Sequence, residues 1–394
     1  MIRRETYLTD LERLKDKRFI KVLTGVRRSG KSTLLALFQE QLITDQVSQT
    51  QIQSYNFEDL ALADYLDYRK LYEKITDNLQ ADQMNHIFLD EIQMVPEFER
   101  VLDSLFVKEN VDLYVTGSNA YMLSGELAPL LSGRYVELKV YPLSFVEFFN
   151  TLAGDKATVF QRYPEFGGFP YATEIPDELT YRDYISGIVN TVLIKDVLQR
   201  KQRSDATLVE QLAKYLTDSS GGLVTIKKIA DTLTSMGQKT ASDTVSTYLS
   251  GFQEAYLFFR ADRYDIAGKK YLSINSKYYP VDQSLRKVLL GNKRPNFGHR
   301  LEGVVYLELL RRGYQVFIGN IGEFKIDFVA QKNGVTEYYQ VSLTVEDDRT
   351  YQREVRPFQS IQDNYRKILL TMDNGRYNQE GTEQLNIIDW LLAR

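Results

Sequence analysis

The chain of 394 residues carries a formal net charge of −4; 26% of its residues are charged, 43% are hydrophobic and none is cysteine. This length predicts two or three domains, the composition excludes a disordered chain, and the missing cysteines exclude disulfides and thiolate metal sites. No apolar run approaches the roughly 18–20 residues of a membrane span, and no apolar segment follows the charged N-terminus as in a secretory signal, so we expect a cytoplasmic protein.

The first part of the chain alternates short apolar runs with helical patterns. Residues 19–24 form a β-branched run that Gly25 closes, and a helical pattern extends from residue 31 to residue 42. The alternation continues with strands expected at 86–89, 113–116 and 136–140 and helices around 71–79 and 98–107. This spacing predicts a parallel sheet covered by helices on both faces, so we assign residues 1–175 to an α/β domain.

The loop after the first strand fits the phosphate-binding pattern G-x-x-x-x-G-K-S at every required position. Glycines let the backbone curl so that its amides face phosphate oxygens, and the following helix N-terminus favours negative charge. Lys31 is expected to reach the β- and γ-phosphates of ATP, and the Ser32 hydroxyl to bind Mg²⁺. The predicted nucleotide-binding residues are Gly25, Arg28, Ser29, Gly30, Lys31, Ser32 and Thr33.

The next expected strand ends in two acids, Asp90 and Glu91. Asp90 is the candidate Mg²⁺ ligand beside Ser32, as the Walker B aspartate is in P-loop NTPases. Glu91 is the candidate catalytic residue that orients or deprotonates the attacking water, which favours hydrolysis over simple binding. The alternative is an ordinary strand that ends in solvated acids.

Two further residues are candidates for catalysis. The strand at 113–116 continues into Gly117-Ser118-Asn119, and its end is expected beside the phosphate loop, where Asn119 or Ser118 would sense the γ-phosphate or position water. A plain turn is the alternative for these residues. Arg134 is expected to neutralise transition-state charge, in its own chain or towards a neighbouring subunit. A surface arginine is the alternative for Arg134.

The middle of the chain, residues 176–295, is predicted to be mainly helical. A polar helical segment covers 180–203, and the later elements are helices at 208–216, 226–233 and 241–254 and strands at 257–263 and 270–274. Three helices followed by a hairpin match the plan of a winged helix. Residues 195–300 contain 18 Lys/Arg against 10 Asp/Glu, which points to a polyanion or to an ordinary solvated basic surface. Lys239, Ser242 and Thr244 are the candidate nucleic-acid contacts.

Several blocks of the chain resemble the prokaryotic AAA-type ATPases that carry a C-terminal domain of unknown function. Residues 18–35 resemble the phosphate loop of this family, and its later blocks are similar to 88–93, 116–120 and 131–134, in the same order. Residues 300–303, 326–329 and 339–342 resemble its C-terminal domain. The resemblance implies an ATPase domain, a winged-helix-like middle and a nuclease-like α/β end over residues 296–394.

The order of elements in residues 296–394 is that of PD-(D/E)xK, or restriction-endonuclease-like, domains. In such nucleases acidic side chains hold Mg²⁺ and a lysine supports the nucleophilic water. Glu302 and Asp327 stand in the expected order, but Gln340 replaces the next acid and Ser342 replaces the lysine. We therefore predict a degenerate site, which Glu323 or Lys325 would restore only if the fold brings them there.

The leading hypothesis is an ATPase whose Mg-ATP hydrolysis rearranges its basic winged-helix and nuclease-like half, with DNA as the partner. One alternative is a nucleotide-switched module that binds proteins, including further copies of the chain, without nucleic acid. Another is a metal-dependent DNA endonuclease. None of these hypotheses involves a membrane.

Overall fold

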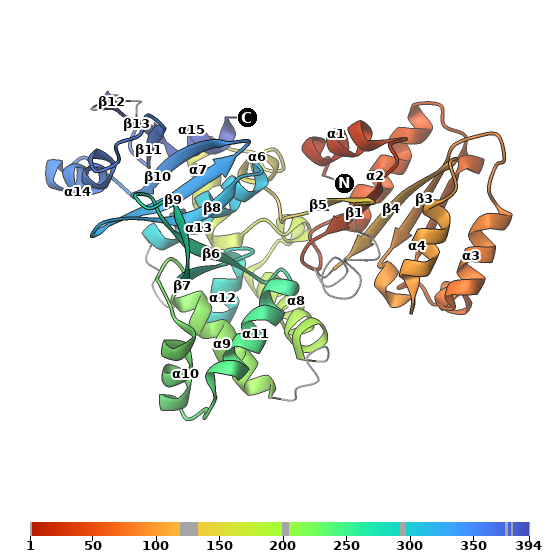
Figure 1. Cartoon of the computed structure of the whole chain (residues 1–394), viewed down its shortest axis with the longest axis horizontal. Helices are drawn as coiled ribbons and strands as arrows, with labels where there is room; N and C mark the ends of the chain where they lie inside the picture. The colour runs from red at the N-terminus through yellow and green to blue at the C-terminus, as the bar shows by residue number, and fades with distance from the viewer. Residues whose placement is uncertain are drawn as a thin grey trace. The chain divides into compact units, whose positions relative to one another are not determined.

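The computed structural model describes residues 2–118, 133–198, 205–291, 297–374, 377–379 and 381–393. It contains two compact units (Figure 1). The first consists of Met1–Tyr141 together with Glu254–Tyr256, and the second of Pro142–Gln253 together with Leu257–Arg394. Among the described residues, no helix combines the length and the apolar character needed to span a membrane.

The first unit contains the predicted parallel sheet. Its strands, in spatial order, are β2 (Ile52–Asn56), β3 (Asn85–Asp90), β4 (Val111–Gly117), β1 (Ile20–Thr24) and β5 (Tyr135–Lys139). Every neighbouring pair of strands is parallel. The strands β1, β3, β4 and β5 confirm the sequence-based expectation, whereas the sequence did not reveal β2, whose polar residues give it no continuous apolar run.

Helices cover both faces of this sheet (Figure 1). The helices α1 (Glu5–Leu14) and α2 (Lys31–Thr44) pack in one core cluster, and α3 (Tyr68–Asp77) and α4 (Phe98–Phe106) pack in another. Leu23 belongs to the first cluster and Val22 to the second, because successive side chains of a strand point to opposite faces. All five residues of β1 are buried, which makes it a rigid base for the loop that follows.

The second unit begins with a group of helices. They are α6 (Phe145–Phe149), α7 (Lys156–Phe166), α8 (Glu178–Thr191), which continues as a π-helix over Val192–Leu198, α9 (Ala206–Asp218), α10 (Ile226–Ser235), α11 (Ser242–Glu254) and α12 (Ser284–Leu290). The helices α9, α10 and α11 precede the antiparallel hairpin of β6 (Phe258–Asp265) and β7 (Lys270–Pro280), in the predicted order. Val224, just before α10, forms an antiparallel bridge with Ser276 of β7.

The same hairpin is part of an eight-stranded sheet. The spatial order is β12-β13-β11-β10-β9-β8-β6-β7, where the remaining strands are β8 (Gln315–Ile321), β9 (Phe324–Lys332), β10 (Val335–Val341), β11 (Arg366–Thr371), β12 (Tyr377–Gln379) and β13 (Thr382–Asn386). The helices α13 (Phe297–Arg311), α14 (Asp348–Gln359) and α15 (Ile387–Leu392) contact these strands.

The division of the chain differs from the three parts expected from the sequence. The first unit ends at Tyr141 rather than at residue 175, and residues 176–295 and 296–394 share one unit. The physical reason is the parallel pairing of β6 with β8, which joins the hairpin of the helical region to the C-terminal strands. Sequence periodicity predicted the two strands of the hairpin but contained no information on which strand they pair with.

Candidate functional site

The loop after β1 needs glycine at two positions. Gly25 has φ +142°, and a Cβ there would lie 2.2 Å from the carbonyl oxygen of Val140, closer than any real contact. Gly30 has φ +97° and precedes the first residue of α2. Both conformations favour glycine strongly. The loop therefore has the backbone shape that its phosphate-binding pattern demands.

Lys31, the first residue of α2, turns back over this loop. Its Nζ donates hydrogen bonds to the carbonyl oxygens of Gly25 (2.9 Å) and Val26 (3.1 Å), and the residue is 4% exposed. The ammonium group is therefore placed inside the loop, where a phosphate would replace the two carbonyls as its partner.

The polar atoms around Ser29 also suit an anion. The Ser29 hydroxyl is buried and has no hydrogen-bond partner among the described residues. The Ser29 carbonyl accepts a hydrogen bond from Nη1 of Arg4 (3.1 Å), which also donates to the Tyr141 carbonyl (2.8 Å). A buried hydroxyl without a partner costs free energy unless a ligand satisfies it. These residues fit the phosphates of a bound nucleotide.

The other predicted nucleotide-binding residues have exposed side chains. Ser32 and Thr33 lie in the first turn of α2 and are exposed, so the Ser32 hydroxyl is accessible to a metal ion. The Arg28 side chain is exposed, and its backbone has φ +64°. Arg27 forms an ion pair with Glu58, at 3.6 Å between Nη1 and Oε1. The loop can thus present the Arg28 amide without using its guanidinium group.

The two acids lie at the carboxyl-terminal edge of the sheet, where β1 also ends. Leu89 pairs with Val115, and Thr116 of β4 pairs with Leu23 of β1, so Asp90 stands in the row beside Thr116 and two strands from the phosphate loop. Since neighbouring strands lie about 4.8 Å apart, the backbones of β1 and β3 are about 10 Å apart here. Phosphates held by the loop and a metal ion held by Asp90 fit within that span.

Thr116 joins the two acids, a role that was not predicted from the sequence. Its hydroxyl donates to Oδ1 of Asp90 and accepts from the backbone amide of Glu91 (2.9 Å). Glu91 has φ +53°, an uncommon conformation for a non-glycine residue, and it accepts a hydrogen bond at Oε2 from Gln93. One hydroxyl therefore fixes both the direction of Asp90 and the turn that carries Glu91. The sequence feature that could have indicated this role is the position of Thr116 near the end of an apolar strand.

The remaining catalytic candidates have different outcomes. Asn119 lies outside the described residues, while its neighbour Ser118 is buried with a hydroxyl that has no partner among the described residues.

Arg134 does not reach the phosphate loop of its own chain. Its carbonyl accepts from the Ile20 amide (2.8 Å) and its Nη1 pairs with Asp103 (2.7 Å), both at the amino-terminal edge of the sheet. The predicted role within its own chain is wrong, because β5 runs parallel to β1 and Arg134 precedes it.

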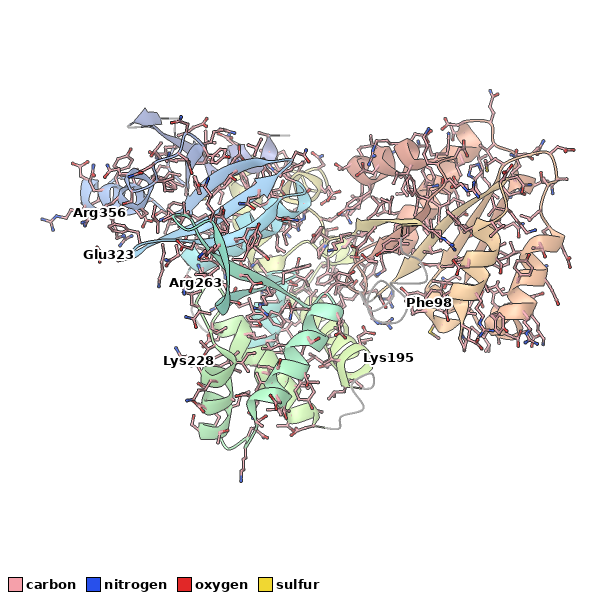
Figure 2. All side chains as sticks on the ribbon, viewed as in Figure 1. Phe98, Lys195, Lys228, Arg263, Glu323 and Arg356 are labelled. Atoms are coloured by element: carbon pink, nitrogen blue, oxygen red, sulfur yellow. The ribbon has the colours of Figure 1, made fainter. Side chains whose placement is uncertain are left out.

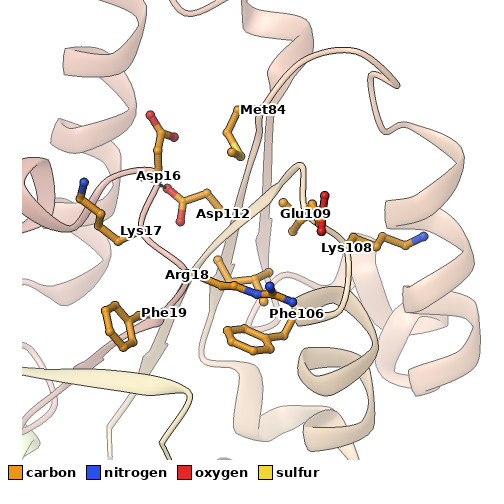
Figure 3. A pocket seen from close by; sticks show the side chains of 11 residues that line it. Asp16, Lys17, Arg18, Phe19, Met84, Phe106, Lys108, Glu109 and Asp112 are labelled. Carbon is orange, nitrogen blue, oxygen red and sulfur yellow. Dashed lines mark hydrogen bonds between the residues drawn. The ribbon is translucent and has the colours of Figure 1, made fainter.

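A pocket of about 200 Å³ opens at this amino-terminal edge (Figure 3). Beside it, Asp16, His86 and Asp112 bring one ligand atom each within 4.8 Å of one another. Asp112 already accepts from Lys21 Nζ and from the Tyr114 hydroxyl (2.6 Å). Although burial opposes ionisation, the neighbouring His86 and the charge of Lys21 hold the pKa of Asp112 below its usual value. A cation would have to displace a buried ammonium, so this cluster stabilises the sheet edge.

The second unit brings together the residues of the predicted nuclease-like site. Asp327 of β9 faces β10, where its amide donates to Oε1 of Gln340 (2.7 Å) and its Oδ2 accepts from the Val341 amide (2.9 Å). Burial, and then the nearby charge of Glu302 on α13, raises the pKa of Asp327 to about 6. Gln340 Nε2 donates to Oε2 of Glu354 on α14 (3.3 Å).

A lysine from another strand lies at this site, although Ser342 occupies the lysine position of the nuclease pattern. Lys277 of β7 donates to Oε1 of Glu302 (2.5 Å), and the Tyr279 hydroxyl donates to the same oxygen (2.5 Å). Although burial opposes the charge, Glu302 and Asp327 raise the pKa of Lys277. Lys277 lies on a strand before α13, so no search for an acid-x-lysine pair could find it. Glu323, labelled in Figure 2, and Lys325 are exposed, whereas Lys277 and Glu302 are buried.

Comparison with known proteins gives two family matches. Residues 17–149 match the family of AAA domains, and residues 157–296 match a domain of unknown function (DUF8612). An uncharacterized protein of Haemophilus influenzae is 39% identical over 402 residues, covering 100% of this chain and 99% of that protein. An uncharacterized protein of Methanocaldococcus jannaschii is 28% identical, covering 94% and 85% respectively.

Among solved structures, a Walker-type ATPase of Pyrococcus abyssi is similar to this chain with a TM-score of 0.53. The sequences are 14% identical, and the match covers 74% of this chain and 96% of that chain. At this identity the likeness concerns the fold alone. The AAA-domain match agrees with the parallel sheet, the phosphate loop and the two acids described above.

Proposed function

This chain belongs to the same family as the Haemophilus influenzae relative and carries an AAA-type ATPase domain, and from this premise we propose that it binds Mg-ATP at residues 25–33 and hydrolyses it. The observation that carries the proposal is the Thr116 hydroxyl, which holds Asp90 and the Glu91 turn at the sheet edge where the phosphate loop begins. An acid pair on a solvated strand end would have no need of such a support.

In the proposed reaction each residue acts on a defined atom. The loop amides and Lys31 bind the β- and γ-phosphate oxygens, while Ser32 and Asp90 hold Mg²⁺. Bound Mg²⁺ neutralises charge on the phosphate oxygens. Glu91 accepts the proton of the water that attacks the γ-phosphorus, and the bond from that phosphorus to the leaving ADP oxygen breaks.

We further propose that the helical part of the second unit contacts nucleic acid through its phosphates, with α9–α11 and the β6–β7 hairpin as a winged-helix-like module. The helix α11 contains no lysine or arginine, whereas Lys227 and Lys228 of α10 are exposed. Figure 2 labels Lys228 on this helix. Lys239 follows α10 and is exposed too. Asp231, one turn along α10, is exposed at the same surface, so the proposal rests on the three exposed lysines, which suit a phosphate backbone more than base recognition.

Duplex DNA binding should therefore weaken steeply with salt. We expect the slope of log K against log salt to become shallower by about 0.9 for each lost phosphate contact, so by about 2 in a Lys227→Gln/Lys228→Gln double variant. The measurement is fluorescence anisotropy of a labelled duplex over a salt series. Lys70→Gln, an exposed lysine of α3 in the first unit, is the matched control. An unchanged slope would favour the alternative of a protein-binding module without nucleic acid.

A second candidate function, metal-dependent DNA cleavage, is favoured by one observation: buried Lys277 donates a hydrogen bond to buried Glu302, near the part-buried Asp327. We propose that these residues fill the roles left open by Gln340 and Ser342. Glu302 and Asp327 would hold Mg²⁺ or Mn²⁺, and Lys277 would stabilise the developing charge. The neutral Gln340, bonded to Glu354, would position Asp327 rather than bind metal.

The nuclease proposal has a sharp test. Wild-type protein with Mn²⁺ is expected to nick plasmid DNA, and both Asp327→Ala and Lys277→Met are expected to lower the rate at least about 10²-fold. Lys325→Met, an exposed lysine on the same strand as Asp327, should cleave like the wild type. Cleavage that survives both substitutions would come from a contaminant, and no cleavage by the wild type would leave the ATPase as the activity of this chain.

A further inference from the structure

A short segment of the chain belongs to a different unit from its neighbours. Residues Glu254–Tyr256 are part of the first unit, while the rest of α11 before them and β6 after them are parts of the second. Tyr256 is 4% exposed and has φ +55°, a conformation that costs free energy in a residue with a bulky side chain. Such a cost persists only where the surrounding contacts hold the residue in place.

The contacts of Tyr256 lead to the start of the phosphate loop. Its hydroxyl donates to Oε1 of Glu137 on β5 (3.0 Å), and the Thr24 hydroxyl donates to the same oxygen (2.6 Å). Thr24 is fully buried, ends β1 and directly precedes Gly25. Burial, and then the charge of Glu137, raises the pKa of Tyr256, so the phenol stays a hydrogen-bond donor at any physiological pH.

We propose that Thr24, Glu137 and Tyr256 form a positioning link that holds the end of β1 in place for nucleotide and connects nucleotide binding to α11 and β6. The inference rests on the proposed ATPase function. When the Lys31 ammonium moves from the Gly25 carbonyl to a phosphate, the peptide between Gly25 and Val26, one residue beyond Thr24, loses a charged hydrogen-bond donor. A resulting shift of Thr24 would move the Glu137 carboxylate, because the Thr24 hydroxyl is hydrogen-bonded to it. The carboxylate would in turn move Tyr256, which lies between α11 and β6.

The link also acts in the reverse direction. A coupling free energy between two sites is reciprocal, so a ligand that pulls on α11 or β6 would change the affinity of the phosphate loop for nucleotide by the same factor. Tyr256 is thus a positioning residue that touches neither substrate nor metal ion. An ordinary buried tyrosine with a satisfied hydroxyl would stabilise the first unit without affecting the phosphate loop selectively.

Amide hydrogen exchange of the full chain separates these two roles. In nucleotide-free protein, Tyr256→Phe is expected to speed exchange about tenfold in the peptides around residues 22–30 and 254–258, the effect of losing one hydrogen bond to a charged acceptor. Tyr163→Phe is the matched control, because it also loses a buried hydroxyl, donated to the Leu143 carbonyl in the second unit (2.8 Å). It should leave both peptides unchanged.

Variants of Glu137 identify the carboxylate as the middle of the link. Glu137→Gln keeps an oxygen that accepts from both hydroxyls and should behave nearly as the wild type, whereas Glu137→Ala should match Tyr256→Phe. The double variant Glu137→Ala/Tyr256→Phe should exchange no faster than Glu137→Ala alone, since each change breaks the same link. Additive effects of the two changes would overturn the link.

Adding Mg-ATP distinguishes failure of the link from failure of the ATPase. In the wild type we expect slower exchange in both peptides, and in Tyr256→Phe slower exchange around 22–30 only. ATP protection of 22–30 in the wild type without protection of 254–258 would overturn the link and leave the ATPase intact. No protection of 22–30 would overturn the ATPase, and the nucleotide-free comparison would still decide whether Tyr256 positions the loop.

Discussion

The Lys31→Ala variant is expected to lose ATP binding, and with it at least about 10²–10³-fold of the ATP hydrolysis rate. Lys31 is buried with its ammonium group inside the phosphate loop, so no other described cation of the loop can take its place without a backbone change. The Arg28 side chain is exposed and Arg27 pairs with Glu58. Nucleotide affinity is measured by calorimetry and turnover by phosphate release.

The substitution also removes two hydrogen bonds to loop carbonyls, so loss of binding must be separated from loss of folding. Thermal unfolding of the variant answers this, and Lys31→Met provides a second variant that keeps the aliphatic stem while removing the charge. Lys70→Ala, on the exposed surface of α3 in the same unit, should bind and hydrolyse ATP like the wild type. A folded Lys31→Ala protein with normal affinity for ATP would contradict the proposed nucleotide site.

The Glu91→Gln variant is expected to keep nucleotide binding and to lose about 10²–10⁴-fold in kcat. Glutamine occupies the same volume and leaves the Glu91 amide bonded to Thr116, so the turn is retained. Because an amide cannot accept the proton of the attacking water, we expect only the rate of the chemical step to fall. Single-turnover hydrolysis and ATP affinity, measured on the same preparation, test whether the rate falls while the affinity is retained.

Two neighbouring substitutions sharpen this second prediction. Thr116→Val removes the hydroxyl that orients both acids, and we expect it to lower kcat while ATP remains bound. Glu73→Gln, an exposed acid of α3, should leave turnover unchanged. If Glu91→Gln lost binding and turnover equally, Glu91 would belong to the ground-state site and the base would have to be sought elsewhere.

In the first unit, the sequence alone contains the local patterns from which the nucleotide site is proposed. The phosphate loop, Asp90 and Glu91 could be predicted because each depends on contiguous residues: glycine where the backbone needs a positive φ, lysine and serine at the start of a helix, acids at the end of an apolar strand. Most helices and strands were predicted for the same reason, since periodic burial is a property of neighbouring residues.

Tertiary structure alone decided which distant residues meet. Strand order and direction put Arg134 at the edge opposite the phosphate loop and Thr116 between the two acids. The shared hairpin joined the last two expected domains into one unit and brought Lys277 to Glu302. The physical reason is that strand pairing is satisfied by backbone groups that every residue carries, so the order of strands leaves no local trace in the sequence.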